Sequence, residues 1–363
     1  MTFIGENMYS IDDYIKSSRV EKKISKEILK YYLSKIELIS KMVSSVENEY
    51  PEIKTCCSLN QKCERIHFFN KDYLLIDIYY IILLNILTTM FYIPQTNEID
   101  VVRFICKHDA ELYYCSGQQV NAALHGICFE QTLYKCQNNS KEKVNLTPTV
   151  ALAISTDVAI QVLFIIFHEI YHWKLSQLQD DEKRQLITKK RNHIITNKPL
   201  NLLPKVVNNC LINYSDDDLR WISTDSNIEE LLCDEYAFRQ VLRVQNIIES
   251  KWMNNIFHLN DFHNSLNTVV ESCILCLDNM KTLCIPQWDV KYASEELLSN
   301  PGAKINYPQG IYEDSEYRFN YFVFDTIINN NDITGNESEY LEHILRLSSI
   351  YRERIFLNAY TNI

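Results

Sequence analysis

The chain has 363 residues, a formal net charge of −11 and very few glycines and prolines, six and eight respectively. Folds with many strands and tight turns need more of both residues, so the composition favours a mainly α fold with a small sheet (α+β). The acidic balance and the lack of a basic stripe argue against nucleic-acid binding. No secretory signal begins the chain, so we expect a cytoplasmic protein whose twelve cysteines, including Cys273-x-x-Cys276, are reduced rather than part of a zinc or redox site.

Residues 1–95 are predicted to form an N-terminal helical region. Between Ser25 and Ser45, apolar residues recur with a period close to 3.6, which is typical of an amphipathic helix. The segment from Leu74 to Ile93 is almost wholly apolar and is long enough to span a bilayer. Asp77 interrupts it, and a carboxylate in hydrocarbon is costly. We therefore expect a buried helix and keep a membrane segment as the alternative.

The next stretch, 96–150, has a mixed pattern. Leu112–Cys115 predicts a short strand, and residues 137–147 predict a polar loop. The polar cluster Ser155–Asp157 then predicts the N-cap of a helix, because its side-chain oxygens can accept the free N–H groups of a first turn. An apolar run follows as far as Trp173, so this helix should be buried on most of its surface.

That helix carries the most informative motif of the chain, His168-Glu169-x-x-His172, at the point where the sequence turns polar. Each helical residue advances about 100°, so residues four apart share a face. His168 and His172 can therefore point two imidazoles at one metal ion, with Glu169 beside it to accept a proton from water. The ordinary alternative is two buried histidines and a solvated glutamate, but a buried imidazole pair beside a carboxylate is costly without a metal.

A catalytic zinc needs a third protein ligand and one open position. The best candidate is Glu230, because Glu230 and Asp234 share one face of a helix predicted over residues 228–238. Glu230 can bind the metal while Asp234 accepts the free N–H of a ligating imidazole. Cys233 is small and lets the two helices approach closely. Glu229 is the rival ligand, but it is rotated about 100° from Glu230, so we expect it to point elsewhere; an acidic, solvated helix end is the alternative.

The remaining elements are less informative. The interval 173–227 separates the two metal-ligand helices and is expected to cap the cleft between them. Residues 240–285 are predicted to be helical again. A loop is expected over 299–315 and a final amphipathic helix over 337–356, where apolar residues return at helical spacing.

Together the two motifs resemble those of the gluzincin metallopeptidases, in which the third ligand is a Glu followed four residues later by an Asp. The long interval between the motifs is similar to that of the phage-exclusion Lit peptidase group, which acts in phage defence. The resemblance implies a zinc ion held by His168, His172 and Glu230, with Glu169 as the catalytic base and Asp234 supporting a ligand. It also implies a zincin-like catalytic core with an active-site helix, a second metal-ligand helix and a small sheet.

The same resemblance suggests three regions: the N-terminal helical region 1–95, a zincin-like metallopeptidase domain over 96–300, and a C-terminal loop and helix, 301–363, packed on that domain. Related families carry a His-Pro and a later Arg that stabilises the oxyanion. The nearest match here is Tyr307-Pro308 with Arg318, so the His is replaced. Tyr307 and Arg318 are therefore the leading catalytic candidates for this role; further candidates are Tyr312, Tyr317, His258 and His263.

The predicted function is zinc-dependent hydrolysis of peptide bonds in a protein substrate, which the resemblance suggests to be a translation factor. In gluzincins an edge strand near the metal helix pairs with the substrate backbone, a role expected here of Leu112–Cys115. No nucleic-acid partner is expected. Two alternatives stay open: a zincin scaffold that keeps its metal but serves as a binding or sensor module, and a membrane-associated zinc protease anchored by residues 74–93.

Overall fold

The computed structural model of the protein describes residues 10–92, 98–137, 147–197 and 223–251, together with 269, 272–277, 279–280 and 318. Within these residues the protein is mostly helical and has one three-stranded sheet, which confirms the mainly α fold with a small sheet. Several predicted features lie outside the described residues: the polar loop around 138–146, the loop at 299–315, the helix at 337–356, Tyr307, Tyr312, Tyr317, His258 and His263.

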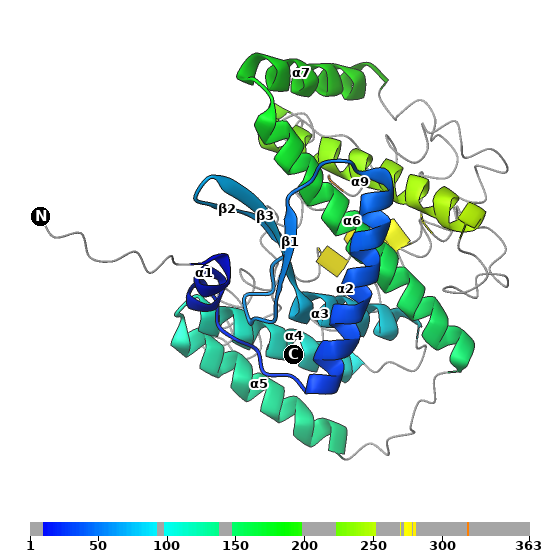
Figure 1. Cartoon of the computed structure of the whole chain (residues 1–363). Helices are drawn as coiled ribbons and strands as arrows, with labels where there is room; N and C mark the ends of the chain where they lie inside the picture. Colours follow the sequence, from blue (N-terminus) through cyan, green and yellow to red (C-terminus); the bar gives the residue numbers. More distant parts are fainter. Residues whose placement is uncertain are drawn as a thin grey trace, which may run out of the picture.

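Helix α6, Pro148–Gln177, runs through the middle of the molecule (Figure 1). Thr147 caps it by accepting a hydrogen bond from the Val150 N–H, and Pro148 stands in the first turn, where its missing N–H has no helical partner to lose. The predicted start at Ser155–Asp157 is wrong, because these residues lie in the second and third turns. Asp157 is buried and accepts hydrogen bonds from neighbouring helices, which explains a polar cluster that mimics an N-cap.

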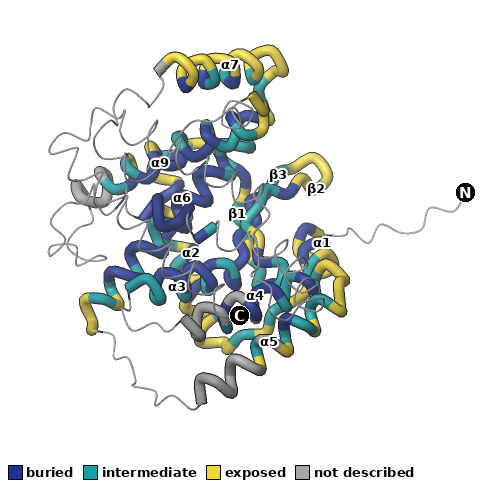
Figure 2. Tube along the Cα trace, turned by 180° about the vertical axis from the view of Figure 1, so that it is seen from behind, coloured by how far each residue is buried: buried dark blue, intermediate teal, exposed yellow. Residues whose placement is uncertain are grey.

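Three helices pack against α6: α2 (Lys26–Val46), α3 (Ile78–Tyr92) and α9 (Asp225–Lys251). Their apolar side chains form one hydrophobic core with those of α6, and Figure 2 shows α6 buried along most of its length. Helix α2 confirms the helix predicted between Ser25 and Ser45. Its buried residues lie three, four or one apart and so form one stripe: Tyr32, Ile36, Ile39, Met42 and Val43.

The sheet consists of β1 (Glu52–Cys56), β2 (Glu64–Phe68) and β3 (Lys71–Asp77) in the order β1-β3-β2. Strand β1 is parallel to β3, and β2 is antiparallel to it and forms one edge. The prediction that residues 1–95 are wholly helical is therefore wrong over this stretch. The short helix α1 (Ile11–Ser18) packs its apolar side against the sheet.

The apolar run from Leu74 to Ile93 forms two elements instead of the single buried helix that was expected. Strand β3 ends at Asp77 and α3 begins at the next residue. The Asp77 carboxylate accepts the Tyr79 N–H at 2.9 Å, which caps the new helix, and also accepts the Ser58 N–H at 3.1 Å. A continuous apolar run suits a buried strand as well as a buried helix, so periodicity could not separate them.

Helix α3 has 15 residues, fewer than a bilayer span requires. Of the helices that the structure describes, α6 alone is long and apolar enough to cross a membrane, with a mean hydropathy of 2.3 in its most apolar window. Two thirds of that window, 67%, is buried inside the protein, as is usual for the core helix of a folded domain.

Helices α4 (Glu98–Cys115) and α5 (Gln119–Gln137) form a helical hairpin, with Gly117 in the left-handed region at the turn. Leu112–Cys115 is the last turn of α4, so the short strand predicted there is wrong. The tyrosines favour a strand locally, but packing of α4 against α5 overrides that preference. Helix α7 (Asp180–Asn197), within the interval 173–227, packs on α9 and leaves its outer face exposed (Figure 2).

Candidate metal centre

Three predicted ligands converge where α6 meets α9. The Nε2 atoms of His168 and His172 lie 3.0 Å apart. Glu230 of α9 places Oε2 3.3 Å from the His168 Nε2 atom and Oε1 3.2 Å from the His172 Nε2 atom. Two ligands of a tetrahedral zinc ion bound at about 2.0–2.1 Å lie about 3.3 Å apart. The three side chains are therefore spaced as ligands of one small cation would be.

The hydrogen bonds behind the imidazoles determine which ring nitrogens carry protons. The His168 Nδ1 atom lies 2.9 Å from the Asp234 carboxylate, and the His172 Nδ1 atom lies 3.4 Å from that of Glu229. A carboxylate only accepts, so both Nδ1 atoms are donors and both Nε2 atoms of neutral rings present lone pairs. Two lone pairs and the Glu230 carboxylate then face one another, which is repulsive unless a cation lies among them. This donor set fits a metal ion.

Protonation of His168 is the other way to relieve the repulsion among the two Nε2 lone pairs and the Glu230 carboxylate. Burial lowers the pKa of His168, but the hydrogen-bonded carboxylates of Asp234 and Glu230 outweigh it and raise the pKa to about 9. Burial likewise opposes ionisation of Glu230, yet the two imidazoles and Arg318 hold its pKa well below the usual range. Glu230 is thus an anion ready to bind a cation, and a proton competes with the metal at His168.

Arg318 joins the site by its contacts with both acidic residues of α9. Its Nε and Nη2 atoms each lie 2.7 Å from an Asp234 oxygen, and Nη1 lies 2.8 Å from Glu230. Asp234 is fully buried, and burial raises its pKa, but Arg318 and His168 outweigh this and hold it low. The guanidinium therefore balances the buried charge and orients two carboxylates. The predicted oxyanion role of Arg318 stays a prediction, because all three of its nitrogens already face carboxylates.

Glu229 lies in the site, against the expectation that it points elsewhere. One carboxylate oxygen contacts the His172 Nδ1 atom, and the other lies 2.6 Å from the Lys183 ammonium group on α7. Glu229 and Glu230 both contact α6 because they meet different ring nitrogens. Glu229 contacts the Nδ1 atom of His172, and Glu230 contacts the Nε2 atoms of both histidines. Each histidine thus has its own carboxylate behind it, Asp234 for His168 and Glu229 for His172.

Cys233 is the rival third ligand, since ligand atoms of His168, His172 and Cys233 all lie within 4.8 Å of one another. Zinc binds the thiolate, so the thiol must lose its proton. Burial, together with the nearby carboxylates of Glu230 and Asp234, raises the pKa of Cys233. Glu230 is already ionised and places one oxygen 3.3 Å from the His168 Nε2 atom and the other 3.2 Å from the His172 Nε2 atom, so the arrangement favours Glu230.

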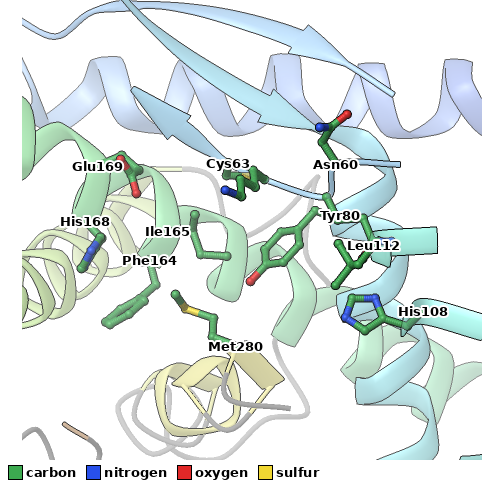
Figure 3. A pocket seen from close by; sticks show the side chains of 12 residues that line it. Asn60, Cys63, Tyr80, His108, Leu112, Phe164, Ile165, His168, Glu169 and Met280 are labelled. Atoms are coloured by element: carbon green, nitrogen blue, oxygen red, sulfur yellow. The ribbon is translucent and has the colours of Figure 1, made fainter. Parts of the chain in front are cut away.

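Glu169 lines a cavity of about 310 Å³ that also reaches the ligand residue His168 (Figure 3). Burial raises its pKa, which the two neighbouring histidines only partly offset. The Arg65 backbone N–H of β2 faces the carboxylate and favours its ionised form. A carboxyl group with a raised pKa, at the edge of a cavity and beside a cation site, is suited to accept and return a proton.

Side-chain hydrogen bonds connect the β2–β3 hairpin to α6 just after His172. The Trp173 indole donates a hydrogen bond to Asp72 at 3.1 Å, and the Arg65 guanidinium donates one to Ser176. The backbone N–H of Arg65 faces Glu169. The edge of β2 that is not paired with β3 therefore faces the candidate metal centre. Backbone groups alternate along a strand, so those of His67 face the same way.

The structure brings together His168, Glu169, His172, Glu230, Asp234 and Arg318 as six of the seven predicted site residues; Tyr307 lies outside the described residues. Sequence reasoning missed the contributions of Glu229 and Lys183 and all of the cavity wall contributed by α3, α4 and the loop before β2. No local pattern marks those wall residues, because they come from segments far apart in the chain.

Comparison of this chain with protein-family models, with curated proteins and with solved structures found no match. The likeness to gluzincins therefore depends on the two helical motifs, and the case for a metal depends on the geometry of the donor set.

Proposed function

We propose that the protein is a zinc-dependent metallopeptidase with a zincin-like core, in which His168, His172 and Glu230 hold the metal. The observation that carries the proposal is the convergence of two imidazole lone pairs and one carboxylate, with the half-buried carboxyl group of Glu169 at the adjoining cavity. Zinc in such a site lowers the pKa of water and polarises a carbonyl group.

Glu169 acts as the general base and then as the general acid. Burial raises its pKa, which makes the carboxylate a stronger base, so it can take a proton from water and deliver it to the leaving amine. Asp234 and Glu229 keep each imidazole in the tautomer that directs Nε2 to the metal. Arg318 keeps Glu230 and Asp234 ionised and in place.

Edge strand β2 replaces Leu112–Cys115 as the segment expected to bind the substrate backbone. Its outward-facing backbone group at Arg65 lies beside Glu169, so an extended peptide paired along this edge would pass the reacting groups. The substrate is then an unfolded or flexible segment of a protein. A translation-factor substrate, a cytoplasmic location and a role in phage defence stay predictions from the resemblance.

The deciding experiment compares wild type with Glu169→Gln in cells and maps new protein termini. The variant should retain zinc and its unfolding temperature while losing nearly all cleavage, because only the proton acceptor is removed. Glu37→Gln, the same change at an exposed position of α2, should behave as wild type. Identical new termini, or none, in wild type and Glu169→Gln with zinc bound would favour the binding or sensor module instead.

A further inference from the structure

The cavity beside Glu169 has walls of distinct chemistry (Figure 3). His168 and Glu169 lie at one end and His108 and Leu112 of α4 at the other. Between them the walls are mostly apolar: Phe164 and Ile165 of α6, Tyr80 of α3, and Met280. A volume of about 310 Å³ is at the lower limit for a ligand pocket, so it suits one large side chain and excludes a longer peptide segment.

One polar residue in this wall has features that point to a ligand. Gln61 lines the cavity, is only 5% exposed and has a φ of 55°, a backbone conformation that favours glycine. Its Nε2 atom faces Glu111 at 3.4 Å, which orients the amide. Its Oε1 atom has no hydrogen-bond partner among the described residues. A buried, unsatisfied acceptor is costly, and strained residues cluster at binding sites.

The charges around the cavity narrow the class of occupant further. The Glu169 carboxyl group at one end disfavours an anionic side chain, and the Lys62 ammonium-bearing side chain, also in the wall, disfavours a cationic one. The Gln61 oxygen requires a donor, and the apolar walls require a large hydrophobic surface. Tyrosine and tryptophan are the side chains that combine an aromatic body with one uncharged donor.

We infer that this cavity selects a substrate tyrosine or tryptophan next to the reacting bond, with Gln61 accepting the hydrogen bond from its hydroxyl or indole N–H. This inference rests on the proposed function, because the proposed base Glu169 and one proposed metal ligand, His168, border the cavity. It makes Gln61 a residue that determines specificity while taking no part in the proton transfers.

The test measures binding of three amino-acid hydroxamates to the zinc-loaded protein, identical except for their 4-hydroxybenzyl, benzyl or carboxyethyl side chains. The 4-hydroxybenzyl compound should bind roughly tenfold to a hundredfold more tightly than the benzyl compound, which lacks the donor, and the carboxyethyl compound should bind weakest. In Gln61→Leu the first ratio should fall to about one, with zinc content unchanged. Gln118→Leu, at an exposed position, should keep the wild-type ratio.

Gln61→Asn provides a second variant, since asparagine tolerates a positive φ and its shorter side chain withdraws the acceptor. It should lose the same discrimination. A ratio near one in the zinc-loaded wild type, or a wild-type ratio in a folded Gln61 variant, would overturn the inference while leaving the metallopeptidase proposal intact.

A second pair of probes needs no metal. Binding of 4-methylphenol and toluene, followed by NMR in metal-free protein, should show the same preference for the phenol and its loss in Gln61→Leu. If the protein binds no zinc but prefers the phenol, the proposed function fails while the selectivity of the cavity stands. Equal binding of both compounds in wild type would overturn the selectivity.

Discussion

Helix α6 contributes to two polar clusters, and they differ in which groups complete their hydrogen bonding. In its N-terminal half, Asp157 accepts hydrogen bonds from the Tyr92 and Ser272 hydroxyl groups at 2.5 and 2.7 Å. One turn later, Gln161 donates to the Thr88 hydroxyl at 3.0 Å and accepts from Asn279 at 2.9 Å. In its C-terminal half, the Nε2 atoms of His168 and His172 and the Glu230 carboxylate converge, and all three are acceptors when the imidazoles are neutral.

The difference shows how a structural cluster can be told from a functional one. In the first cluster protein donors meet protein acceptors, so the helices need nothing else to pack. In the second cluster, the Nδ1 atoms of the two imidazoles donate to Asp234 and Glu229. The Nε2 atoms have no proton to donate and can bind a cation. The first cluster therefore contributes to stability alone, whereas the second should bind a metal.

The largest expected effect separates the two clusters directly. His168→Ala, and likewise His172→Ala, should abolish stoichiometric zinc binding, because two remaining ligands do not hold zinc tightly. Gln161→Leu should keep one zinc per chain but lose stability, at roughly 1–3 kcal/mol for each buried partner left unsatisfied. Metal analysis and thermal unfolding of the purified variants measure both. Full zinc content in both histidine variants would mean that the second cluster is structural too.

The next prediction concerns which residue of α9 completes the cation site. Glu230→Ala should lose stoichiometric zinc, since it removes the carboxylate whose two oxygens lie 3.3 and 3.2 Å from the Nε2 atoms of His168 and His172. Cys233→Ala should retain zinc, because the raised pKa keeps the Cys233 thiol protonated. Zinc titrations on both variants decide between them. Loss of zinc in Cys233→Ala with retention in Glu230→Ala would assign the third ligand to Cys233.

A pH series distinguishes a proton from a metal ion in the same place. In the metal-free protein the pKa of His168 is raised from 6.5 to about 9, so its stabilising contribution is complete below pH 6.5 and is lost as the pH rises through 9. A shift of this size corresponds to about 3 kcal/mol. Zinc needs the neutral ring, so its affinity should rise with pH up to about 9. Thermal unfolding with and without zinc tests this; parallel pH profiles would contradict it.

The smallest effects should come from the carboxylates behind the imidazoles. Asp234→Asn and Glu229→Gln should each weaken zinc binding by roughly 10- to 100-fold, because they loosen the orientation of a ligand without removing it. Asp234 should matter more, since its contact with His168 is shorter and fully buried. Glu37→Gln, at an exposed position of α2, serves as the control and should leave zinc affinity unchanged. An unchanged zinc affinity in Glu229→Gln would mean that the contact between Glu229 and His172 does not help to hold the metal.

Local chain geometry determined much of the candidate site. The four-residue spacing of His168 and His172, and of Glu230 and Asp234, places each pair on one helical face whatever surrounds it, because helix periodicity is a property of consecutive residues. The helix between Ser25 and Ser45 was predictable for the same reason, since its apolar stripe repeats along the chain. The few glycines and prolines were likewise enough to predict a mainly helical protein.

Other features depend on contacts that no local pattern encodes. The run that begins at Leu74 is almost wholly apolar, and contacts with other segments make its residues up to Asp77 a strand and those from Ile78 to Tyr92 a helix. Glu229 turns to the site because His172 and Lys183 are there to meet it. The cavity wall combines α3, α4, α6 and the loop before β2, and Gln61 became visible as a binding residue only when these segments packed together. Consecutive residues set the spacing of side chains along a helix, whereas burial, partner and cavity are set by segments distant in sequence, so the tertiary structure alone decides them.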